Sequence, residues 1–220
     1  IMPVPVLQKW QAKAPTVGFY NCFGQSEVAP LTTVLRPEEH EARPDSAGKP
    51  VLFVEARVVD ASGDDVPTGE SGEIVYRSPQ LCDGYWNNFK ATEQAFADGW
   101  FHSGDLVRQD EEGYIFVVDR IKDVINTGGV LVASREVEDA VYQDERVAEV
   151  AVIGTPDPKW IEAVTAVVVL KDGAEATEDE IIAGTREYLA PFKVPKRVVF
   201  VDELPRNQSG KLLKRELRQG

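Results

Sequence analysis

The hydrophobic pattern of the chain changes at Asp119-Arg120, and this change limits the folds that it can adopt. Before this point, short apolar runs such as Glu73 to Arg77 are separated by turn residues such as Ala61 to Asp65, which predicts antiparallel strands. After it, apolar strands alternate with segments that carry helix signals. We therefore expect an α/β (α+β) chain with a β-rich first part, residues 1–118, and a smaller α+β second part, residues 119–220.

The second part contains the clearest single elements. The run from Ala163 to Leu170 is apolar enough to predict a strand that is buried on both faces. Thr177-Glu-Asp-Glu180 has the spacing of a capping box, which predicts the start of a helix. Ser134 is a candidate N-cap for another helix, which runs to about Gln143. Further expected elements are strands over 147–153 and 196–201, a polar loop over 204–210 and a short helix from Lys211.

The first part gives weaker signals. A short helix over 5–14 is expected, followed by a strand over Val17–Tyr20 that enters a loop, Asn21 to Glu27. Val51 to Val59 predicts a longer strand, and Asp110 to Gly113 predicts a hairpin loop with glycine in the tight position.

Charge and cysteine content exclude several classes of protein. The 220 residues include 24 basic and 37 acidic ones, for a net charge of −13, which argues against a general nucleic-acid binder. Residues 186–220 nevertheless carry nine basic and four acidic side chains, as on a phosphate-handling face or an ordinary solvated helix surface. Two isolated thiols, Cys22 and Cys82, form neither a disulfide framework nor a zinc site, so a reducing cytoplasmic setting is expected. His40 and His102 lack metal-ligand spacing and are expected to be ordinary surface residues.

Three polar segments contain residues with ligand-binding chemistry. In Asn21 to Glu27, an aromatic ring, a glycine, a hydroxyl and a carboxylate could contact a base, a phosphate and Mg²⁺, although a polar turn is the better explanation of this segment taken alone. Asp105 follows a glycine and could accept both hydroxyls of a ribose, or could only cap its own turn. Lys211 follows the polar loop Pro205 to Gly210, which lacks the spacing of a Walker motif, and a lone lysine is usually a solvated charge.

Taken together and in order, these segments resemble the adenylate-forming acyl-CoA synthetases, the superfamily that also contains firefly luciferase and the adenylation domains of peptide synthetases. The resemblance extends from about Phe19 to Arg218. It is carried by Phe23-Gly-Gln-Ser-Glu27, Gly69-Glu-Ser-Gly-Glu-Ile74, Gly84-Tyr-Trp86 with Thr92, Gly99-Trp-Phe-His-Ser-Gly-Asp105, Gly113-Tyr114, Asp119-Arg-Ile-Lys-Asp-Val-Ile125 with Gly128-Gly129, and Pro205-Arg-Asn-Gln-Ser-Gly-Lys211.

The resemblance implies an adenylate site in the first part of the chain. Phe23 stands where an aromatic ring packs on adenine, and Ser26 stands where a threonine usually contacts the α-phosphate. Glu27 matches the acidic residue associated with Mg²⁺. Asp105 and Arg120 match the residues that hold the ribose hydroxyls.

The resemblance implies that residues of the second part enter and leave the active site as this part moves. Lys122 matches the hinge position, and Lys211 matches the lysine that bridges the carboxylate and the phosphate during adenylation. Gly128 and Gly129 match the loop that lines the channel for the pantetheine of coenzyme A. Departures from the family pattern lie nearby: Val130 replaces an acidic residue, Ser134 a proline, and Ile161 the glycine that usually follows Trp160.

The resemblance also assigns the two parts. Residues 1–118 would be the barrel-like β end of a large adenylation domain, and residues 119–220 a small mobile lid domain. The family's pyrophosphate loop does not occur in the sequence, so we expect a C-terminal fragment of a longer synthetase that is inactive alone.

The implied enzyme is an AMP-forming acid–thiol ligase that uses ATP, Mg²⁺ and coenzyme A. Its carboxylic acid is expected to be a fatty acid, with aryl and short-chain acids still open. We expect peripheral membrane contact for a lipid substrate, no nucleic-acid partner and self-association of the fragment. The alternatives are an adenylation domain of a peptide-synthetase-like system, a luciferase-like oxygenase and a non-catalytic binding module.

Overall fold

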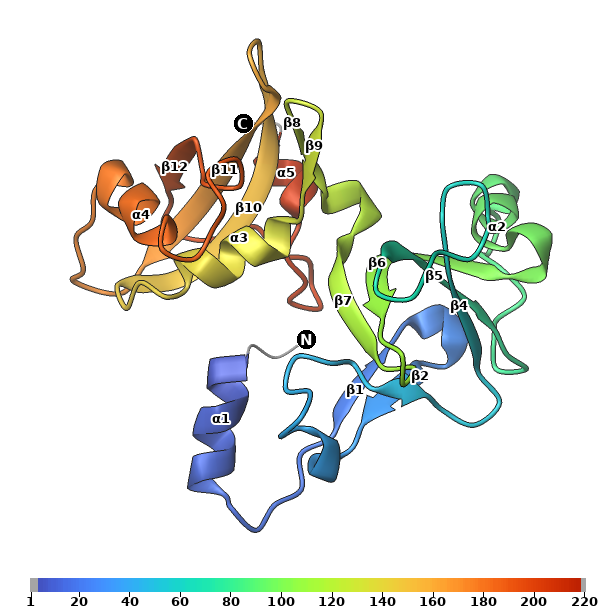
Figure 1. The fold of residues 1–220 in the computed structure, drawn as a ribbon. Helices are drawn as coiled ribbons and strands as arrows, with labels where there is room; N and C mark the ends of the chain where they lie inside the picture. Colours follow the sequence, from blue (N-terminus) through green and yellow to red (C-terminus); the bar gives the residue numbers. More distant parts are fainter. Residues whose placement is uncertain (1–3, 219–220) are drawn as a thin grey trace. The chain divides into compact units, whose positions relative to one another are not determined.

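The computed structural model describes residues 4–218, and the chain divides into a first unit that ends at Ile121 and a second unit that begins at Lys122 (Figure 1). The sequence placed a boundary at 118/119, which lies inside strand β7 (Ile115–Arg120). Because Asp119 and Arg120 still pair with Leu106 and Asp105 on the neighbouring strand, the first unit extends to the end of this strand.

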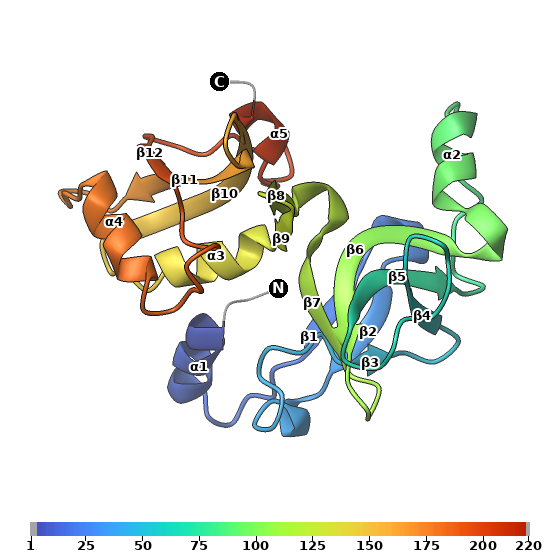
Figure 2. The same cartoon turned by 45° about the horizontal axis from the view of Figure 1, so that its top comes forward.

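The first unit contains two antiparallel sheets (Figure 2). The three-stranded sheet consists of β1 (Asn21–Gly24), β2 (Leu31–Leu35) and β3 (Lys49–Pro50). The four-stranded sheet contains β4 (Glu55–Val59), β5 (Ser71–Arg77), β6 (Phe101–Gln109) and β7 in chain order. Helices α1 (Val4–Lys13) and α2 (Phe89–Ala95) and short 3₁₀ turns at Ser26–Val28, Pro37–Glu39 and Ala97–Gly99 complete the unit.

The first unit has a main apolar core and a smaller cluster of Leu35, Tyr114 and Phe116. Phe23 of the three-stranded sheet packs against the main core, whose buried members come from the four-stranded sheet and from nearby turns and loops: Val28, Ala47, Val54, Val58, Ile74, Tyr76, Phe101, Val107 and Ile115. The expected hairpin at 110–113 is confirmed, since Asp110 Oδ1 accepts the backbone N–H groups of Glu112 and Tyr114 and Gly113 has φ +85°.

Three local expectations for the first unit were wrong, and one helix was missed. The strand lies at Asn21–Gly24 rather than Val17–Tyr20, because residues 21–24 pair with β2 while Val17 and Tyr20 are exposed. The strand predicted from Val51 begins only at Glu55, since the preceding residues turn through Phe53 at φ +65°. His40 is not a surface residue but is 5% exposed. Helix α2, capped by the side chain of Asn88, was not expected.

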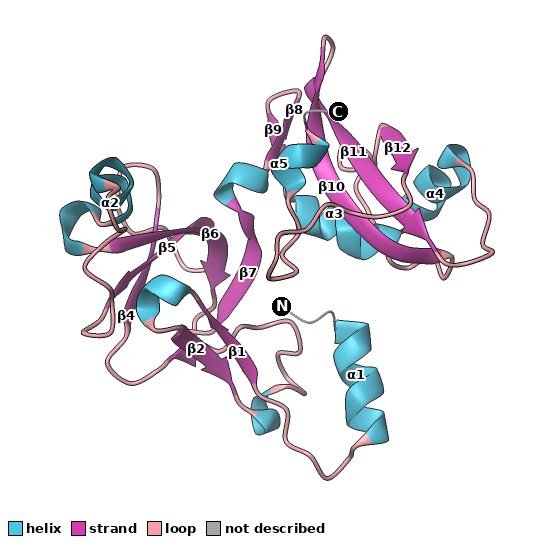
Figure 3. Ribbon diagram, turned by 180° about the vertical axis from the view of Figure 1, so that it is seen from behind, coloured by secondary structure: helices cyan, strands magenta, loops and turns pink. Residues whose placement is uncertain are grey.

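The second unit is a five-stranded sheet covered on both faces. Its order is β10 (Val147–Asp157), β11 (Ile161–Leu170), β8 (Ile125–Thr127) and β9 (Val130–Val132), and β12 (Arg197–Phe200) runs parallel to β11. Helices α3 (Ser134–Val141) and α4 (Glu178–Thr185) pack on one face, and α5 (Lys214–Leu217) packs on the other (Figure 3).

Two predictions for this unit are confirmed and one is corrected. Residues 163–168 are all buried, because alternate side chains of β11 enter the cores on opposite faces of the sheet. The capping box at Thr177 is present with both reciprocal hydrogen bonds. Ser134, however, is the first helical residue rather than the N-cap, and its buried hydroxyl accepts a hydrogen bond from Lys214 Nζ at 2.7 Å.

Candidate active site

Asp105, in the middle of β6, and Arg120, the last residue of β7, form an ion pair between two neighbouring strands. They are direct cross-strand partners on β6 and β7, and Arg120 Nε lies 2.6 Å from Asp105 Oδ1. The Asp105 side chain is 3% exposed and that of Arg120 is 36% exposed. A buried carboxylate needs such a cation to offset the loss of water. Antiparallel pairing therefore places together two residues that lie in separate sequence motifs.

A second contact fixes the other oxygen of the same carboxylate. The Gln25 amide donates to Asp105 Oδ2 at 3.0 Å and to the carbonyl oxygen of Ser103 at 2.9 Å. Beneath it, the Ser103 hydroxyl donates to the carbonyl oxygen of Ile74 at 2.6 Å and accepts the backbone N–H of Asp105 at 3.0 Å. Both carboxylate oxygens and the backbone N–H of Asp105 are thus held before any ligand binds.

The segment that contains Gln25 also carries three of the predicted site residues. Phe23 is half-buried, on β1, and packs against the core of the first unit. Gly24 permits a tight approach of the chain, because a Cβ there would lie 1.9 Å from the carbonyl oxygen of Pro30. Ser26 and Glu27 begin the 3₁₀ turn that follows. The bond from Gln25 to Asp105 therefore joins this segment to the Asp105–Arg120 ion pair.

Glu27 is held by the loop before α2. Its Oε1 accepts a hydrogen bond from the Tyr85 hydroxyl at 2.8 Å, and its carbonyl oxygen accepts the backbone N–H of Cys82 at 2.9 Å. Burial and the bond to Glu27 raise the pKa of Tyr85 to about 12, so the phenol stays protonated as a donor at neutral pH. Tyr76, which is fully buried below Thr32, has its pKa raised by burial as well.

The chemistry of Glu27 fits an Mg²⁺ ion that is bound together with a nucleotide. The described residues contain no group of three or more His, Cys, Asp or Glu side chains that could hold a metal by themselves. Mg²⁺ in nucleotide sites is commonly held by one or two carboxylates, phosphate oxygens and water. A single half-exposed carboxylate such as Glu27 matches that mode of binding.

The paired glycines of the second unit form a tight hairpin turn. Gly128 and Gly129, at φ +64° and +86°, connect β8 to β9, as expected for a type I′ turn that requires left-handed backbone at both positions. The Asn126 side chain accepts the N–H of Gly129 at 3.0 Å, and Gly128 N–H donates to the carbonyl oxygen of Trp160 at 2.6 Å. A Cβ on Gly128 would lie 3.3 Å from the Trp160 ring. The glycines thus allow this turn to lie against the hairpin of β10 and β11.

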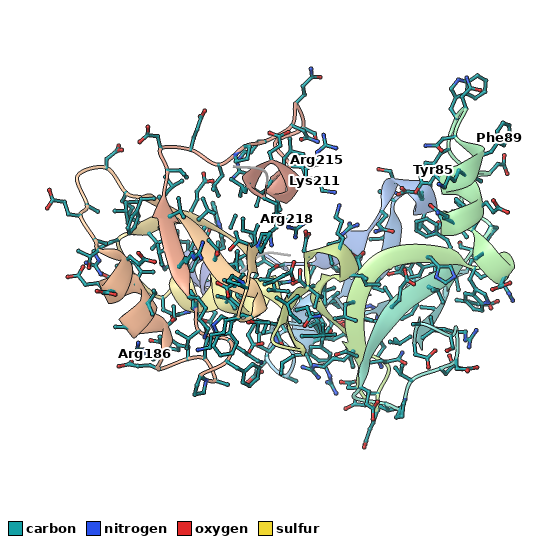
Figure 4. The ribbon with its side chains drawn as sticks, turned by 90° about the horizontal axis from the view of Figure 1, so that it is seen from above. Tyr85, Phe89, Arg186, Lys211, Arg215 and Arg218 are labelled. Atoms are coloured by element: carbon teal, nitrogen blue, oxygen red, sulfur yellow. The ribbon has the colours of Figure 1, made fainter. Side chains whose placement is uncertain are left out.

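Lys211 ends a loop that is more ordered than its polar sequence indicates. Asn207 Oδ1 accepts hydrogen bonds from the backbone N–H groups of Ser209 and Lys211 at 3.1 and 2.8 Å. Arg206 donates to the carbonyl oxygen of Gly210 at 2.9 Å. Lys211 itself is exposed, and it precedes α5 (Figure 4). The loop therefore presents a lysine ammonium to solvent on a fixed backbone.

Helix α5 is attached to the rest of the second unit by two basic residues. Lys214 Nζ lies 2.7 Å from Glu138 Oε1 on α3. An Arg218 guanidinium nitrogen lies 2.9 Å from Asp123 Oδ1. Asp123 directly follows the exposed Lys122 in the sequence. Part of the basic character of residues 186–220 is thus structural, because these cations are paired within the unit.

The structure brings together some of the predicted residues and assigns the rest to the other unit. Asp105 and Arg120 are in contact, and Gln25 links Asp105 to the segment with Phe23, Ser26 and Glu27. Lys122, Gly128, Gly129 and Lys211 belong to the second unit. Sequence reasoning missed the roles of Gln25, Tyr85 and Asn207, although each lies inside a quoted motif.

Comparison with known proteins identifies relatives of both units. Residues 1–86 match the AMP-binding enzyme family, and residues 136–211 match the AMP-binding enzyme C-terminal domain. A feruloyl-CoA synthase from Amycolatopsis sp is 45% identical over 203 residues, which are 92% of this chain and 41% of the synthase. A medium/long-chain-fatty-acid–CoA ligase from Mycobacterium tuberculosis is 46% identical over 208 residues, which are 91% of this chain and 36% of the ligase.

A solved structure shares the fold. The o-succinylbenzoate CoA synthetase from Bacillus subtilis, in complex with its acyl-adenylate intermediate, superposes with a TM-score of 0.90 at 33% identity. The match covers 98% of this chain and 44% of that synthetase. The same synthetase has also been solved with ATP and a magnesium ion. The chain therefore spans about two fifths of the length of the curated relatives it matches.

Proposed function

The chain belongs to the AMP-binding enzyme family, and from this membership we propose that it forms part of a longer AMP-forming acid–CoA ligase. The first unit would be the β-rich end of the adenylation domain, and the second unit the mobile lid. The observation that carries the proposal is the ion pair of Arg120 with the buried carboxylate of Asp105, which is also held by Gln25 from the motif that contains Glu27.

In the first half-reaction, a carboxylate oxygen attacks the α-phosphorus of ATP, and pyrophosphate leaves. Asp105 and Arg120 would bind the ribose hydroxyls, Phe23 would pack on adenine and Ser26 would contact the α-phosphate. Mg²⁺, held by Glu27, would offset negative charge on the phosphates. Lys211 would bring a further positive charge to the phosphate and the carboxylate, whose charges must be stabilised as the bond forms. The exposure of Lys211 on an ordered loop supports this role.

In the second half-reaction, the sulfur of coenzyme A attacks the carbonyl carbon of the acyl-adenylate, AMP leaves and the thiol proton is released. Gly128 and Gly129 would line the channel of the pantetheine arm. Lys122 would absorb the rotation of the lid between the two half-reactions, as hinge residues at the ends of elements do. Its place as the first residue of the second unit supports this role.

The acid is proposed to be a fatty acid, and a lipid substrate would bring the enzyme into peripheral contact with a membrane. No helix among residues 4–218 is long and apolar enough to cross a bilayer. We place the enzyme in the cytoplasm, where the exposed free thiols of Cys22 and Cys82 would stay reduced.

The test is carboxylate-dependent pyrophosphate release by the full-length protein across a panel of fatty, aryl and short-chain acids, with and without coenzyme A. We expect one acid class to give pyrophosphate and, with coenzyme A present, a thioester and AMP. Asp105→Asn should raise the KM for ATP about tenfold or more, because it weakens both the ion pair and the acceptor for the ribose. Nucleotide binding without pyrophosphate release for any acid would favour a non-catalytic module and overturn the proposal.

A further inference from the structure

The hydrogen bond from Tyr85 to Glu27 is not used by any of the roles proposed above. It joins residues 58 positions apart, at 2.8 Å between the phenol oxygen and Oε1. Because it engages one carboxylate oxygen, it restricts the rotation of the Glu27 side chain. Glu27 is the residue that would hold the cation, so the direction in which its second oxygen points matters for the reaction.

The loop that carries Tyr85 is built to hold that ring in one place. Gly84, at φ +142°, packs so closely on Thr92 that a Cβ would lie 2.5 Å from its methyl carbon. Thr92 Oγ1 accepts the backbone N–H of Tyr85 at 2.9 Å and donates to the carbonyl oxygen of Asn88 at 3.0 Å. This ties the backbone on both sides of the ring to the first turn of α2 (Figure 4).

The ring itself is seated on the core of the first unit. Tyr85 makes an edge-to-face contact with Phe96 at a centroid distance of 6.4 Å, and Phe96 in turn packs on the buried Phe101 at 5.1 Å. The Cys82 N–H, bonded to the Glu27 carbonyl oxygen, fixes the backbone of the same pair of segments. The phenol is thus placed by backbone bonds, ring packing and a glycine that tolerates no side chain.

We propose that Tyr85 is a positioning residue for the Glu27 carboxylate, and that it orients this group toward a divalent cation bound with the phosphates of ATP. The proposal rests on the proposed function, since it requires Glu27 to meet such a cation. Tyr85 does not contact the cation or the reacting atoms. It fixes one oxygen of Glu27 before the metal binds. The side chain therefore loses less conformational entropy when it binds the metal.

The experiment measures metal binding directly in the full-length protein. Mn²⁺, which is visible by electron paramagnetic resonance, is titrated into the protein together with a non-hydrolysable ATP analogue. Tyr85→Phe removes the hydroxyl and keeps the ring against Phe96. We expect it to weaken Mn²⁺ binding about fivefold to tenfold, as for the loss of one hydrogen bond to a charged acceptor. The affinity for the analogue without metal should change less than twofold.

The chain offers a matched control in the same unit. Tyr114 also donates from its hydroxyl to a glutamate Oε1 at 2.8 Å, but its partner is Glu39, which has no proposed role. Tyr114→Phe should therefore cause a comparable loss of thermal stability with no change in Mn²⁺ affinity. Equal weakening of Mn²⁺ binding by both variants would overturn the proposal, because the effect would then be merely structural.

A double variant tests whether Tyr85 acts through Glu27. Glu27→Gln alone should weaken Mn²⁺ binding, and adding Tyr85→Phe to it should have no further effect. If Tyr85→Phe leaves Mn²⁺ affinity unchanged while Glu27→Gln weakens it, this inference fails and the proposed function stands. If the unaltered protein binds no Mn²⁺ with the ATP analogue, both fail.

Discussion

The side-chain amide of Gln25 donates a hydrogen bond of 3.0 Å to the buried carboxylate of Asp105, eighty residues further along the chain. Together with the Arg120 contact on the other oxygen, it leaves this carboxylate little freedom to rotate. Groups that are oriented in advance bind a ligand without losing further conformational entropy. Gln25 thus links the segment that carries the residues predicted to contact adenine and phosphate to the carboxylate predicted to contact the ribose.

This coupling gives a first prediction for the full-length enzyme. Gln25→Ala should raise the KM for ATP about fivefold to tenfold, because Asp105 loses the hydrogen bond from the Gln25 amide and the 23–27 segment loses its attachment. ATP–pyrophosphate exchange measures the effect. The affinity for coenzyme A should stay the same, and an unchanged KM for ATP would show that Gln25 does not orient the ribose site.

Lys211 should separate the two half-reactions. Lys211→Ala should lower adenylation at least a hundredfold, because it removes the positive charge that we propose to stabilise the phosphate and the carboxylate as the bond forms. Thioester formation from pre-made acyl-adenylate should persist at near the normal rate. Single-turnover assays with each starting material measure the two steps. An equal fall in both would withdraw the assignment of Lys211 to the first step.

Substitution of Lys122 should affect thioester formation more than adenylation. Lys122→Pro fixes φ near −65° and removes a backbone donor at the first residue of the second unit, so the lid should rotate more slowly. We expect thioester formation to fall about tenfold or more and adenylation to fall less. The same pair of single-turnover assays measures this, with Lys122→Ala as the control that removes the charge but not the backbone freedom. Normal thioester formation by the proline variant would contradict the hinge role.

The sequence predicts correctly those elements that are determined by interactions between residues close together in the chain. The Thr177 capping box and the two-sided burial of β11 depend on residues within one turn or one strand. Strand β1 was missed because Asn21, Cys22 and Gly24 have weak strand preference and become a strand only by pairing with β2. Its register also contains an irregularity between Phe23 and Gly24, which no local pattern indicates.

In the candidate site, too, the sequence identifies single residues, whereas the contacts between them depend on the fold. The family resemblance identifies Asp105 and Arg120 as residues of interest, but only the register of β6 and β7 makes them direct partners. The contacts of Gln25 and Tyr85 span 80 and 58 residues, so a linear pattern cannot reveal which residue each one holds. Position within a motif was the available signal for both: Gln25 lies between Phe23 and Ser26, which were already assigned roles, and Tyr85 lies in the quoted segment Gly84-Tyr-Trp86.

Ile161 offers a prediction on stability that is independent of catalysis. This β-branched residue has φ +67° and its side chain is 60% exposed at the start of β11. Left-handed backbone costs an L-residue about 1–2 kcal/mol, and the extra freedom of glycine in the unfolded chain costs about 0.5–1 kcal/mol. Ile161→Gly should therefore raise the free energy of unfolding by about 0.5–1 kcal/mol as the balance of these effects.

The urea-induced unfolding transition of the second unit measures this change in the free energy of unfolding. Val199→Gly is the control, because Val199 is also half-exposed on the same sheet but is not among the residues with positive φ. It should lower stability by about 1 kcal/mol, as a glycine in a strand does. Destabilisation by Ile161→Gly would mean that the packing of the isoleucine outweighs its backbone strain.

The 220-residue chain alone should not turn over ATP and a carboxylate. The residues assigned to adenine, ribose and the α-phosphate are present, but the family's loop for the β- and γ-phosphates does not occur in the sequence. Binding energy at those phosphates normally positions the α-phosphorus for attack, so its loss should reduce the rate by several orders of magnitude. A pyrophosphate-release assay on the purified chain, with the full-length protein as positive control, measures this. Carboxylate-dependent release above the background without protein would contradict the prediction.

The same chain should also self-associate at high concentration. Val17, Tyr20, Leu52 and Phe53 expose between 56% and 79% of their surface in the first unit, and Trp86 and Phe89 expose 92% and 87%. Exposed apolar side chains of this size favour association or covering by another part of a protein. Sedimentation velocity over a hundredfold range of concentration should show an increase in mean mass, which the double variant Trp86→Ser with Phe53→Ser should reduce. A chain that stays monomeric over that range would show that these side chains are tolerated in water.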